Sequence, residues 1–263
     1  MARRHRELRH LWRSQLEIER QILERQFQEQ VGYEPALLKL RTFNEKIQWR
    51  KLFDRRELFP ALTDKIAVRS YVEARVGKAY LIPLIHVSDS LDGATLDAFT
   101  PPFIVKPNHV SGVTLPVRIG SAVEEAGVAE VIADCLRVPY GIPDVQWAYW
   151  KIKPRVIVER LLEDERGGLP DDFKFHCFGG KAHFIQVDTD RFTPHRRSTC
   201  FDREWSKLPL SRSGIHPART VSRPDNLEAM IRVAQALASG LDYEGKPCDG
   251  WASGVMVLVG PGG

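Results

Sequence analysis

A two-strand hairpin between residues 171 and 191 is the feature that most limits what this chain can fold into. Apolar and polar residues alternate over 171–178 (DDFKFHCF), Gly179-Gly180 supplies a two-residue turn, and 181–191 (KAHFIQVDTDR) returns as the partner strand. Alternation with a period of two buries one side of each strand, and paired glycines permit the positive φ angles of a tight turn. The sequence therefore predicts antiparallel sheet in this part of the chain.

Helical patterns accompany the predicted strands. Over 1–30, apolar residues recur at three-, four- and seven-residue steps, which predicts an amphipathic helix. Its mixed charge favours packing on the rest of the protein or on a partner protein over lying on a membrane. Further helices are expected after a cap at Thr42 or Asn44, from 63–64 to Gly77, over 121–137 and over 224–238, and further strands within 81–90, 103–106 and 155–158. The expected fold class is α+β.

Composition narrows the class of protein only slightly. The 263 residues carry a net charge of +4, which suits a small anion as well as it suits nucleic acid. No apolar run approaches the ~20 residues of a membrane span, and the arginine-rich start lacks the apolar segment of a secretory signal. The four cysteines, Cys135, Cys177, Cys200 and Cys248, lack the spacing of a zinc site. They are expected to be reduced thiols, and the protein is expected to be cytoplasmic.

The stretch 103–112 (FIVKPNHVSG) carries the first candidate for chemistry. Its strand delivers Lys106 to a short polar loop, an arrangement that presents a fixed positive charge and backbone N–H groups to an anion. Lys65 is predicted in the first turn of a helix, where an ammonium opposes the helix dipole unless an anion lies between them. Both lysines are equally compatible with solvated surface positions.

Charged side chains gather again around the hairpin. Three arginines follow its second strand closely, and their guanidinium groups can clamp a phosphate or a carboxylate, although they also suit a solvated loop. Glu159 closes a predicted strand, where it could grip a ribose or an amine or simply belong to an acidic loop. The arginines are Arg191, Arg196 and Arg197; Lys174 on the polar side of the hairpin is grouped with them as a candidate catalytic residue, and Asp188 and Asp190 are weak candidates for a metal site.

In the order and spacing of its motifs the chain resembles the TupA-like branch of the ATP-grasp superfamily. The resemblance runs from about residue 31 to 243, and its matching stretches include RTFNEKIQWRKLFD (41–54), DKIAVRSYV (64–72), FIVKPNHVSG (103–112), KPRVIVERLLEDE (153–165) and FDREW (201–205). Members occur with genes for bacterial cell-surface polysaccharides and are often labelled glycosyltransferases. The resemblance implies two α+β subdomains that grip ATP between them. After the helix over 1–30, the expected division is into N-terminal and central ATP-grasp subdomains over 31–158 and a C-terminal ATP-grasp subdomain over 159–263, with an atypical or truncated end at 244–263.

The resemblance also implies roles for individual residues. Lys65 and Lys106 would contact the nucleotide phosphates, Glu159 would lie by the adenine and ribose, and the three arginines would face phosphate or an acyl substrate. The loop from Asn108 through His109 and Ser111 to Gly112 would be a lid, although valines stand at 110 and 113 where the family favours glycine. The expected partners are ATP and a carboxylate- or sugar-containing acceptor, with no nucleic acid.

The end of the chain departs from the family pattern. The family's magnesium-binding acids lie in this region, whereas residues 244–263 (EGKPCDGWASGVMVLVGPGG) contain only Glu244 and Asp249 as acids. Magnesium on a triphosphate usually takes one or two protein carboxylates. We therefore expect magnesium binding to be doubtful and the C-terminus to be truncated or frame-shifted, with impaired catalysis.

Three functions follow from these features. The first is an ATP-dependent carboxylate ligase acting in surface-polymer synthesis, through phosphorylation of a carboxylate and attack by an amine. The second is a metal-dependent glycosyltransferase, in which Asp188-x-Asp190 holds a divalent ion on a nucleotide sugar. The third is a non-catalytic nucleotide-binding protein. Stabilisation by ATP favours the first or third, and stabilisation by a UDP-sugar with manganese favours the second.

Overall fold

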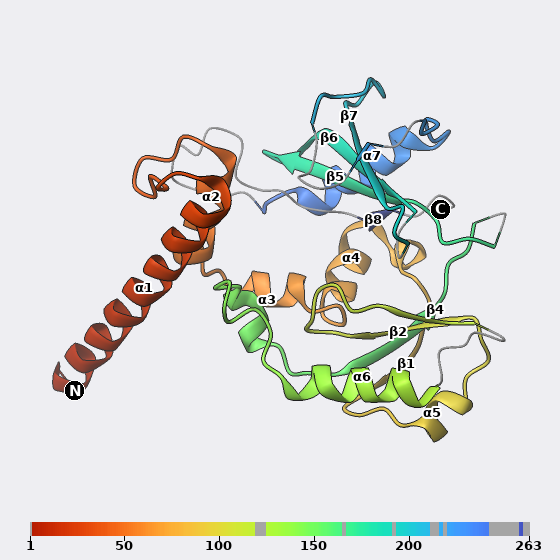
Figure 1. The fold of residues 1–263 in the computed structure, drawn as a ribbon, viewed down its shortest axis with the longest axis horizontal. Coiled ribbons are helices and arrows are strands. Elements are labelled where there is room, and N and C mark those ends of the chain that lie inside the picture. Colours follow the sequence, from red (N-terminus) through yellow and green to blue (C-terminus); the bar gives the residue numbers. More distant parts are fainter. Residues whose placement is uncertain are drawn as a thin grey trace.

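The computed structural model describes residues 2–118, 125–164, 167–190, 193–210, 216–217, 220–241 and 258–259. Two antiparallel four-stranded sheets form separate lobes, and a long N-terminal helix projects from the body (Figure 1). The structure thus belongs to the α+β fold class that the sequence predicts.

The first lobe contains sheet A, with the strand order β1-β4-β2-β3. Alternate residues of its strands, such as Phe103 and Val105, are buried against α5 and α6, which lie on one side of the sheet (Figure 1). The opposite face therefore carries the intervening side chains of β2 and β4. The elements are β1 (Leu84–Ser88), α5 (Gly93–Asp97), β2 (Phe103–Pro107), β3 (Leu115–Val117), α6 (Glu125–Arg137) and β4 (Val156–Arg160).

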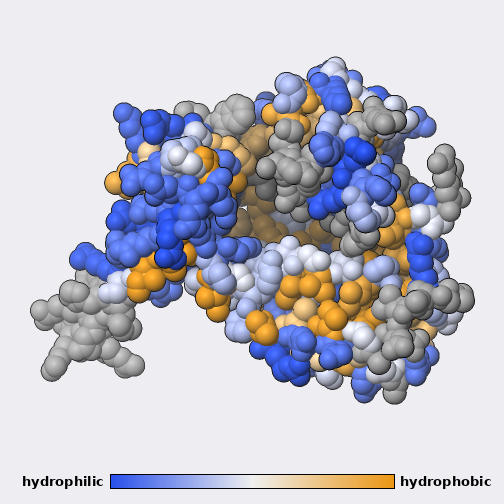
Figure 2. Space-filling model, in the orientation of Figure 1, coloured by the Kyte–Doolittle hydropathy of each residue, from blue (hydrophilic) through white to orange (hydrophobic). Residues whose placement is uncertain are grey.

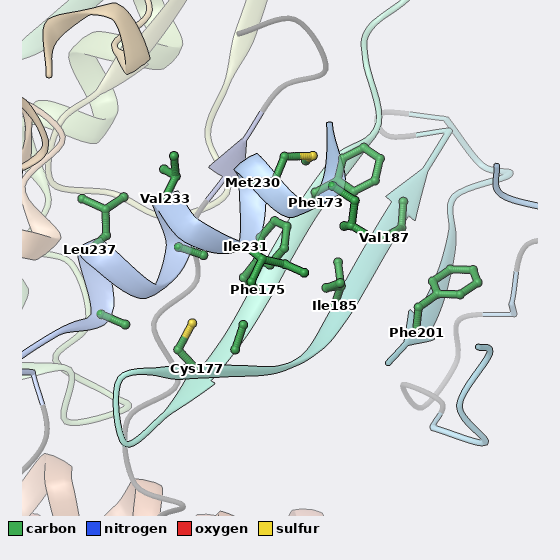
Figure 3. Packing of buried hydrophobic residues seen from close by; sticks show 14 residues of the cluster. Phe173, Phe175, Cys177, Ile185, Val187, Phe201, Met230, Ile231, Val233 and Leu237 are labelled. Atoms are coloured by element: carbon green, nitrogen blue, oxygen red, sulfur yellow. The ribbon is translucent and has the colours of Figure 1, made fainter. Parts of the chain in front are cut away.

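The second lobe contains sheet B, with the strand order β7-β6-β5-β8, and helix α7 (Leu227–Ala238). Phe175 and Ile185 are fully buried between the sheet and α7, in a cluster that Figure 3 shows from close by. The predicted hairpin is confirmed, because β5 pairs antiparallel with β6 and both Gly179 and Gly180 have positive φ. The strands are β5 (Asp172–Phe178), β6 (Lys181–Thr189), β7 (Arg197–Phe201) and β8 (Leu258–Val259).

The remaining helices precede or bridge the lobes. Thr42 caps α2 in a capping box with Glu45, as one of the two predicted caps. Helix α4 packs on α7 of the second lobe, where the Tyr71 hydroxyl donates to the carbonyl of Leu237 at 2.7 Å. These helices are α1 (Ala2–Val31), α2 (Phe43–Phe53), α3 (Leu58–Thr63) and α4 (Val68–Val76), with short 3₁₀ turns at Lys78–Tyr80 and Trp147–Lys151.

Two boundaries differ from what the sequence suggests. Helix α4 begins at Val68, so Lys65 lies in the turn between α3 and α4 and not in the first turn of a helix. The predicted division at 158/159 falls inside β4, a strand of sheet A. Within the described ranges, no helix combines the length and the apolarity needed to cross a membrane.

Candidate functional site

Lys106 and Glu159 meet on the face of sheet A that α6 does not cover. Strand β2 pairs with β4 so that Ile104 faces Glu159, and Lys106 lies two residues further along on the same side. The Lys106 ammonium contacts the Glu159 carboxylate at 2.5 Å, and the two side chains are only 18% and 6% exposed. The strand lysine and the strand-end glutamate therefore form a largely buried ion pair on one surface.

Arg69 of α4 completes the coordination of Glu159. One of its terminal nitrogens donates to the second carboxylate oxygen at 2.9 Å, and the other donates to the backbone carbonyl of Ile82 at 2.7 Å. Sequence reasoning did not single out Arg69. The available signal was its place in the helix predicted from 63–64 to Gly77, four residues after Lys65, because helical residues at this spacing share a face.

Lys65 lies beside this pair and holds the loop that follows β2. Its ammonium donates to the carbonyls of Pro107 at 2.9 Å and Val110 at 2.5 Å. Burial, reinforced by repulsion from Lys106, lowers the pKa of Lys65 to about 8. Lys65 and Lys106 are therefore close enough for each charge to oppose the other.

We call Asp64, Lys65, Arg69, Lys106 and Glu159 the cation cluster. Its formal charges sum to +1 when every member is ionised. Burial, more than repulsion from Lys106, lowers the pKa of Lys65, and the carboxylates of Asp64 and Glu159 partly oppose this effect. The cluster thus places a net positive charge beside the loop that follows β2.

The loop after β2 is anchored by residues that had been expected to bind nucleotide. The Asn108 side chain is fully buried and bonds to Asp64, to the Lys153 carbonyl and to the backbone of Arg155. His109 is also buried, with Nε2 at 3.1 Å from the Cys135 carbonyl. These contacts position the loop, and nucleotide binding by either side chain stays a prediction.

The tip of the same loop faces solvent. Ser111 and Gly112 are exposed, and the Ser111 hydroxyl is within hydrogen-bonding contact of Tyr149. Gly112 has φ of +86°, a conformation that L-residues rarely adopt. The exposed glycine suits the predicted lid, a role that stays a prediction.

A second charged group, the Asp188 cluster, lies on sheet B. Asp188 has no exposed surface, and one of its oxygens accepts from Lys174 and from Arg196, each at 2.6 Å. Gln186 donates to the other oxygen at 2.7 Å. Although burial opposes ionisation, these hydrogen bonds hold the pKa of Asp188 well below its usual range. Asp188 is thus the anionic centre that fixes two of the predicted catalytic cations.

The predicted arginines that follow the hairpin do not all lie on the same face of sheet B. In the register of β6 and β7, Ser198 pairs with Asp188 and Arg197 pairs with Thr189. The Arg197 side chain therefore leaves the strand on the face opposite to that of Asp188. Arg196 alone of the three predicted arginines joins the Asp188 cluster, and Arg191 lies outside the described residues. Asp190 is exposed and has φ of +51°, which separates it from the buried Asp188.

The described residues offer little to a magnesium ion. Among them, no group of three or more His, Cys, Asp or Glu side chains could hold a metal. Asp188 is already bonded to two cations, and a metal would have to displace them. Glu244 and Asp249 fall in 242–250, which the structure leaves undescribed. The described residues therefore offer no site with three such ligands, and we derive no step through magnesium.

Two pockets lie apart from both clusters. One of about 300 Å³ is lined by residues of α1, of the end of α2 and of the turn that contains Trp147 and Trp150. The other, of about 380 Å³, lies between α1, α2 and the segment around Asp144.

The cation cluster lies on the side of sheet A that is turned toward α4. The molecular surface is hollowed between the two lobes on the face seen in Figure 2.

Comparison with known proteins gives one family and several distant structures. The model of the family described as TupA-like ATPgrasp matches residues 45–244. No curated protein matches this chain. An L-amino acid ligase from Bacillus licheniformis is 16% identical with a TM-score of 0.37, over 77% of this chain and 39% of the ligase.

Two further structures are of the ATP-grasp ligase PsnB. One, with a minimal precursor, is 10% identical with a TM-score of 0.34 over 74% of this chain and 51% of PsnB. The other also contains Mg and ADP; it is 10% identical with a TM-score of 0.31, over 74% of this chain and 50% of PsnB. The chain thus spans between two fifths and half of the length of the ligases that it matches.

Proposed function

We propose, since this chain belongs to the TupA-like ATP-grasp family, that it is an ATP-dependent ligase whose nucleotide phosphates lie against the cation cluster. The fold is α+β of the ATP-grasp kind, as expected from the sequence. The observation that carries the proposal is the convergence of Lys65, Lys106 and Glu159, which are remote in sequence, on the side of sheet A that faces α4.

Lys106, Lys65 and Glu159 each have a distinct part in this proposal. Lys106 turns from Glu159 to a phosphate oxygen, because its ammonium is a compact charge on a flexible stem. Lys65 keeps the loop after β2 in place through the carbonyls of Pro107 and Val110 and adds positive charge behind it. Glu159 is left beside the sugar, where a carboxylate accepts hydroxyl hydrogen bonds.

The Asp188 cluster supplies the second set of charges. Lys174 and Arg196 are held by one carboxylate and leave part of their donors for an anionic acceptor or a transferred phosphoryl group. ATP would supply the phosphoryl group that activates a carboxylate toward attack by an amine. Roles for Arg191 and Arg197, and a place in surface-polysaccharide synthesis, rest on the family resemblance alone. Impaired catalysis likewise stays a prediction, because residues 242–257 are not described.

The alternative of a metal-dependent glycosyltransferase has less support. It needs Asp188 and Asp190 to share a divalent ion, whereas Asp188 is buried between Lys174 and Arg196 and Asp190 is exposed in a different backbone conformation. Breaking those ion pairs would leave two partly buried cations without a partner. A non-catalytic nucleotide-binding protein would share the cation cluster and differ only in turnover.

Thermal denaturation with nucleotides tests the proposal. ATP at about 100 times its Kd adds about 2.7 kcal/mol to the free energy of unfolding, which raises Tm by roughly 5–10 °C for a chain of this size. UDP-glucose with manganese should leave Tm unchanged. A shift with UDP-glucose and none with ATP would favour the glycosyltransferase. ADP release with carboxylate and amine mixtures then separates a ligase from a binding protein.

The pH dependence of ATP binding should reflect Lys65. Its pKa in the free protein is about 8, and a bound phosphate raises it. Well below pH 8 the ammonium is already protonated and affinity is independent of this group. As the pH rises above 8, binding must take up a proton, and affinity falls by up to tenfold per pH unit.

Calorimetry at pH 8.5 in two buffers with different ionisation enthalpies measures this proton uptake. The wild-type protein should show a binding enthalpy that depends on the buffer, and Lys65→Met should lose that dependence. Equal proton uptake in both proteins would mean that Lys65 does not sense the nucleotide.

A further inference from the structure

Glu159 is held by two cations that are anchored in different ways. The carboxylate belongs to a residue that is 5% exposed, so each of its oxygens needs a bond from the protein. Lys106 supplies one such bond, and no second anchor is described for its ammonium. Arg69 supplies the other bond while its second nitrogen is fixed on the Ile82 carbonyl at 2.7 Å.

This difference decides which partner can leave. If a phosphate takes Lys106, Glu159 remains paired as long as the guanidinium of Arg69 stays in place. Without Arg69, Lys106 would be the only cation described on a buried carboxylate, and moving it to a phosphate would strand that charge. The anion would then compete with Glu159 for Lys106 at a disadvantage.

We propose that Arg69 is a positioning residue that holds the Glu159 carboxylate in place, so that Lys106 is free to exchange its carboxylate partner for a nucleotide phosphate. The inference rests on the proposed function of the cation cluster. It assigns to α4 a part in nucleotide binding, in addition to its packing on α7.

A double-mutant cycle on ATP affinity tests the role of Arg69. Arg69→Met is expected to weaken ATP binding at least tenfold, because Lys106 stays on Glu159. In a Glu159→Gln background the neutral amide no longer retains Lys106, and adding Arg69→Met should change affinity less than threefold. Arg69→Lys keeps the charge but lacks the planar fork that spans Glu159 and Ile82, so it should restore part of the lost affinity.

Arg75→Met is the matched control, because Arg75 lies on the same helix and also donates to backbone carbonyls, those of Ala236 and Ser239. It should leave ATP affinity unchanged while it lowers Tm. If Arg69→Met fails to fold, the comparison of Arg69→Lys with Arg75→Lys takes its place, with weaker binding expected only for the first.

The outcomes separate this inference from the proposed function. Absence of ATP binding in the wild-type protein would overturn both. ATP binding that is lost in Lys106→Met but unchanged in Arg69→Met would overturn the inference and keep the proposed function. A tenfold loss from Arg69→Met that is the same in both backgrounds would show that Arg69 does not act through Glu159 and would also overturn the inference.

Discussion

Replacing Lys106 with Met is expected to weaken ATP binding by about 2–4 kcal/mol, or roughly 30- to 1,000-fold in Kd. The methionine fills a similar volume on β2 but removes the ammonium that we place against the phosphates. The stated range allows for the ion pair with Glu159, which must break before Lys106 can bind a nucleotide. Calorimetric titration of the wild-type protein and the variant with ATP measures the change.

Lys39→Met serves as the control for this substitution. Lys39 is exposed on the segment before α2, so the same change of charge there should leave Kd within a factor of two. The Lys106 variant should also keep its fold, because Arg69 still neutralises Glu159. An unchanged ATP affinity in a folded Lys106→Met protein would remove β2 from the nucleotide site.

Replacing Asp188 with Asn should have the largest effect on stability, a loss of about 3 kcal/mol in the free energy of unfolding. Loss of one partner from a buried ion pair costs ~3–5 kcal/mol. The lower end of this energy range applies because the Arg196 side chain is 37% exposed, so water can partly solvate its charge once the carboxylate is gone. The amide also replaces one acceptor oxygen with an NH₂ group, either where Lys174 and Arg196 donate or where Gln186 donates.

Asp190→Asn is the matched control, because it makes the same chemical change two residues away on an exposed residue whose positive φ asparagine tolerates. Urea unfolding at pH 7 should show a difference of about 3 kcal/mol between the two variants. Equal effects would contradict the central position of Asp188. Because the folded-state pKa of Asp188 is lowered, its stabilisation is present above its unfolded pKa of ~3.9 and is lost as the pH falls further.

Local patterns were enough to predict much of the fold. The hairpin of β5 and β6 follows from alternation and a diglycine turn, and the apolar positions of α7 follow from helical spacing. The start of α4 was misplaced because Asp64 resembles a helix cap. Its carboxylate does accept the N–H of Ile66 at 2.8 Å, but this bond closes a turn that precedes the helix.

The candidate site depends on pairings that no local pattern contains. Lys106 and Glu159 meet because β2 pairs with β4, and Arg69 reaches them because α4 lies over the same face. The three arginines after the hairpin appeared equivalent in sequence. Strand β7 begins at Arg197, so its alternation sends Arg197 and the Asp188 cluster to opposite faces.

A crystal structure with a non-hydrolysable ATP analogue tests the central claim most directly. The account predicts phosphate oxygens within about 3 Å of the Lys106 ammonium, with Glu159 released from Lys106 but still bonded to Arg69. A nucleotide seated in either pocket beside α1, with the ion pair of Lys106 and Glu159 intact, would contradict it.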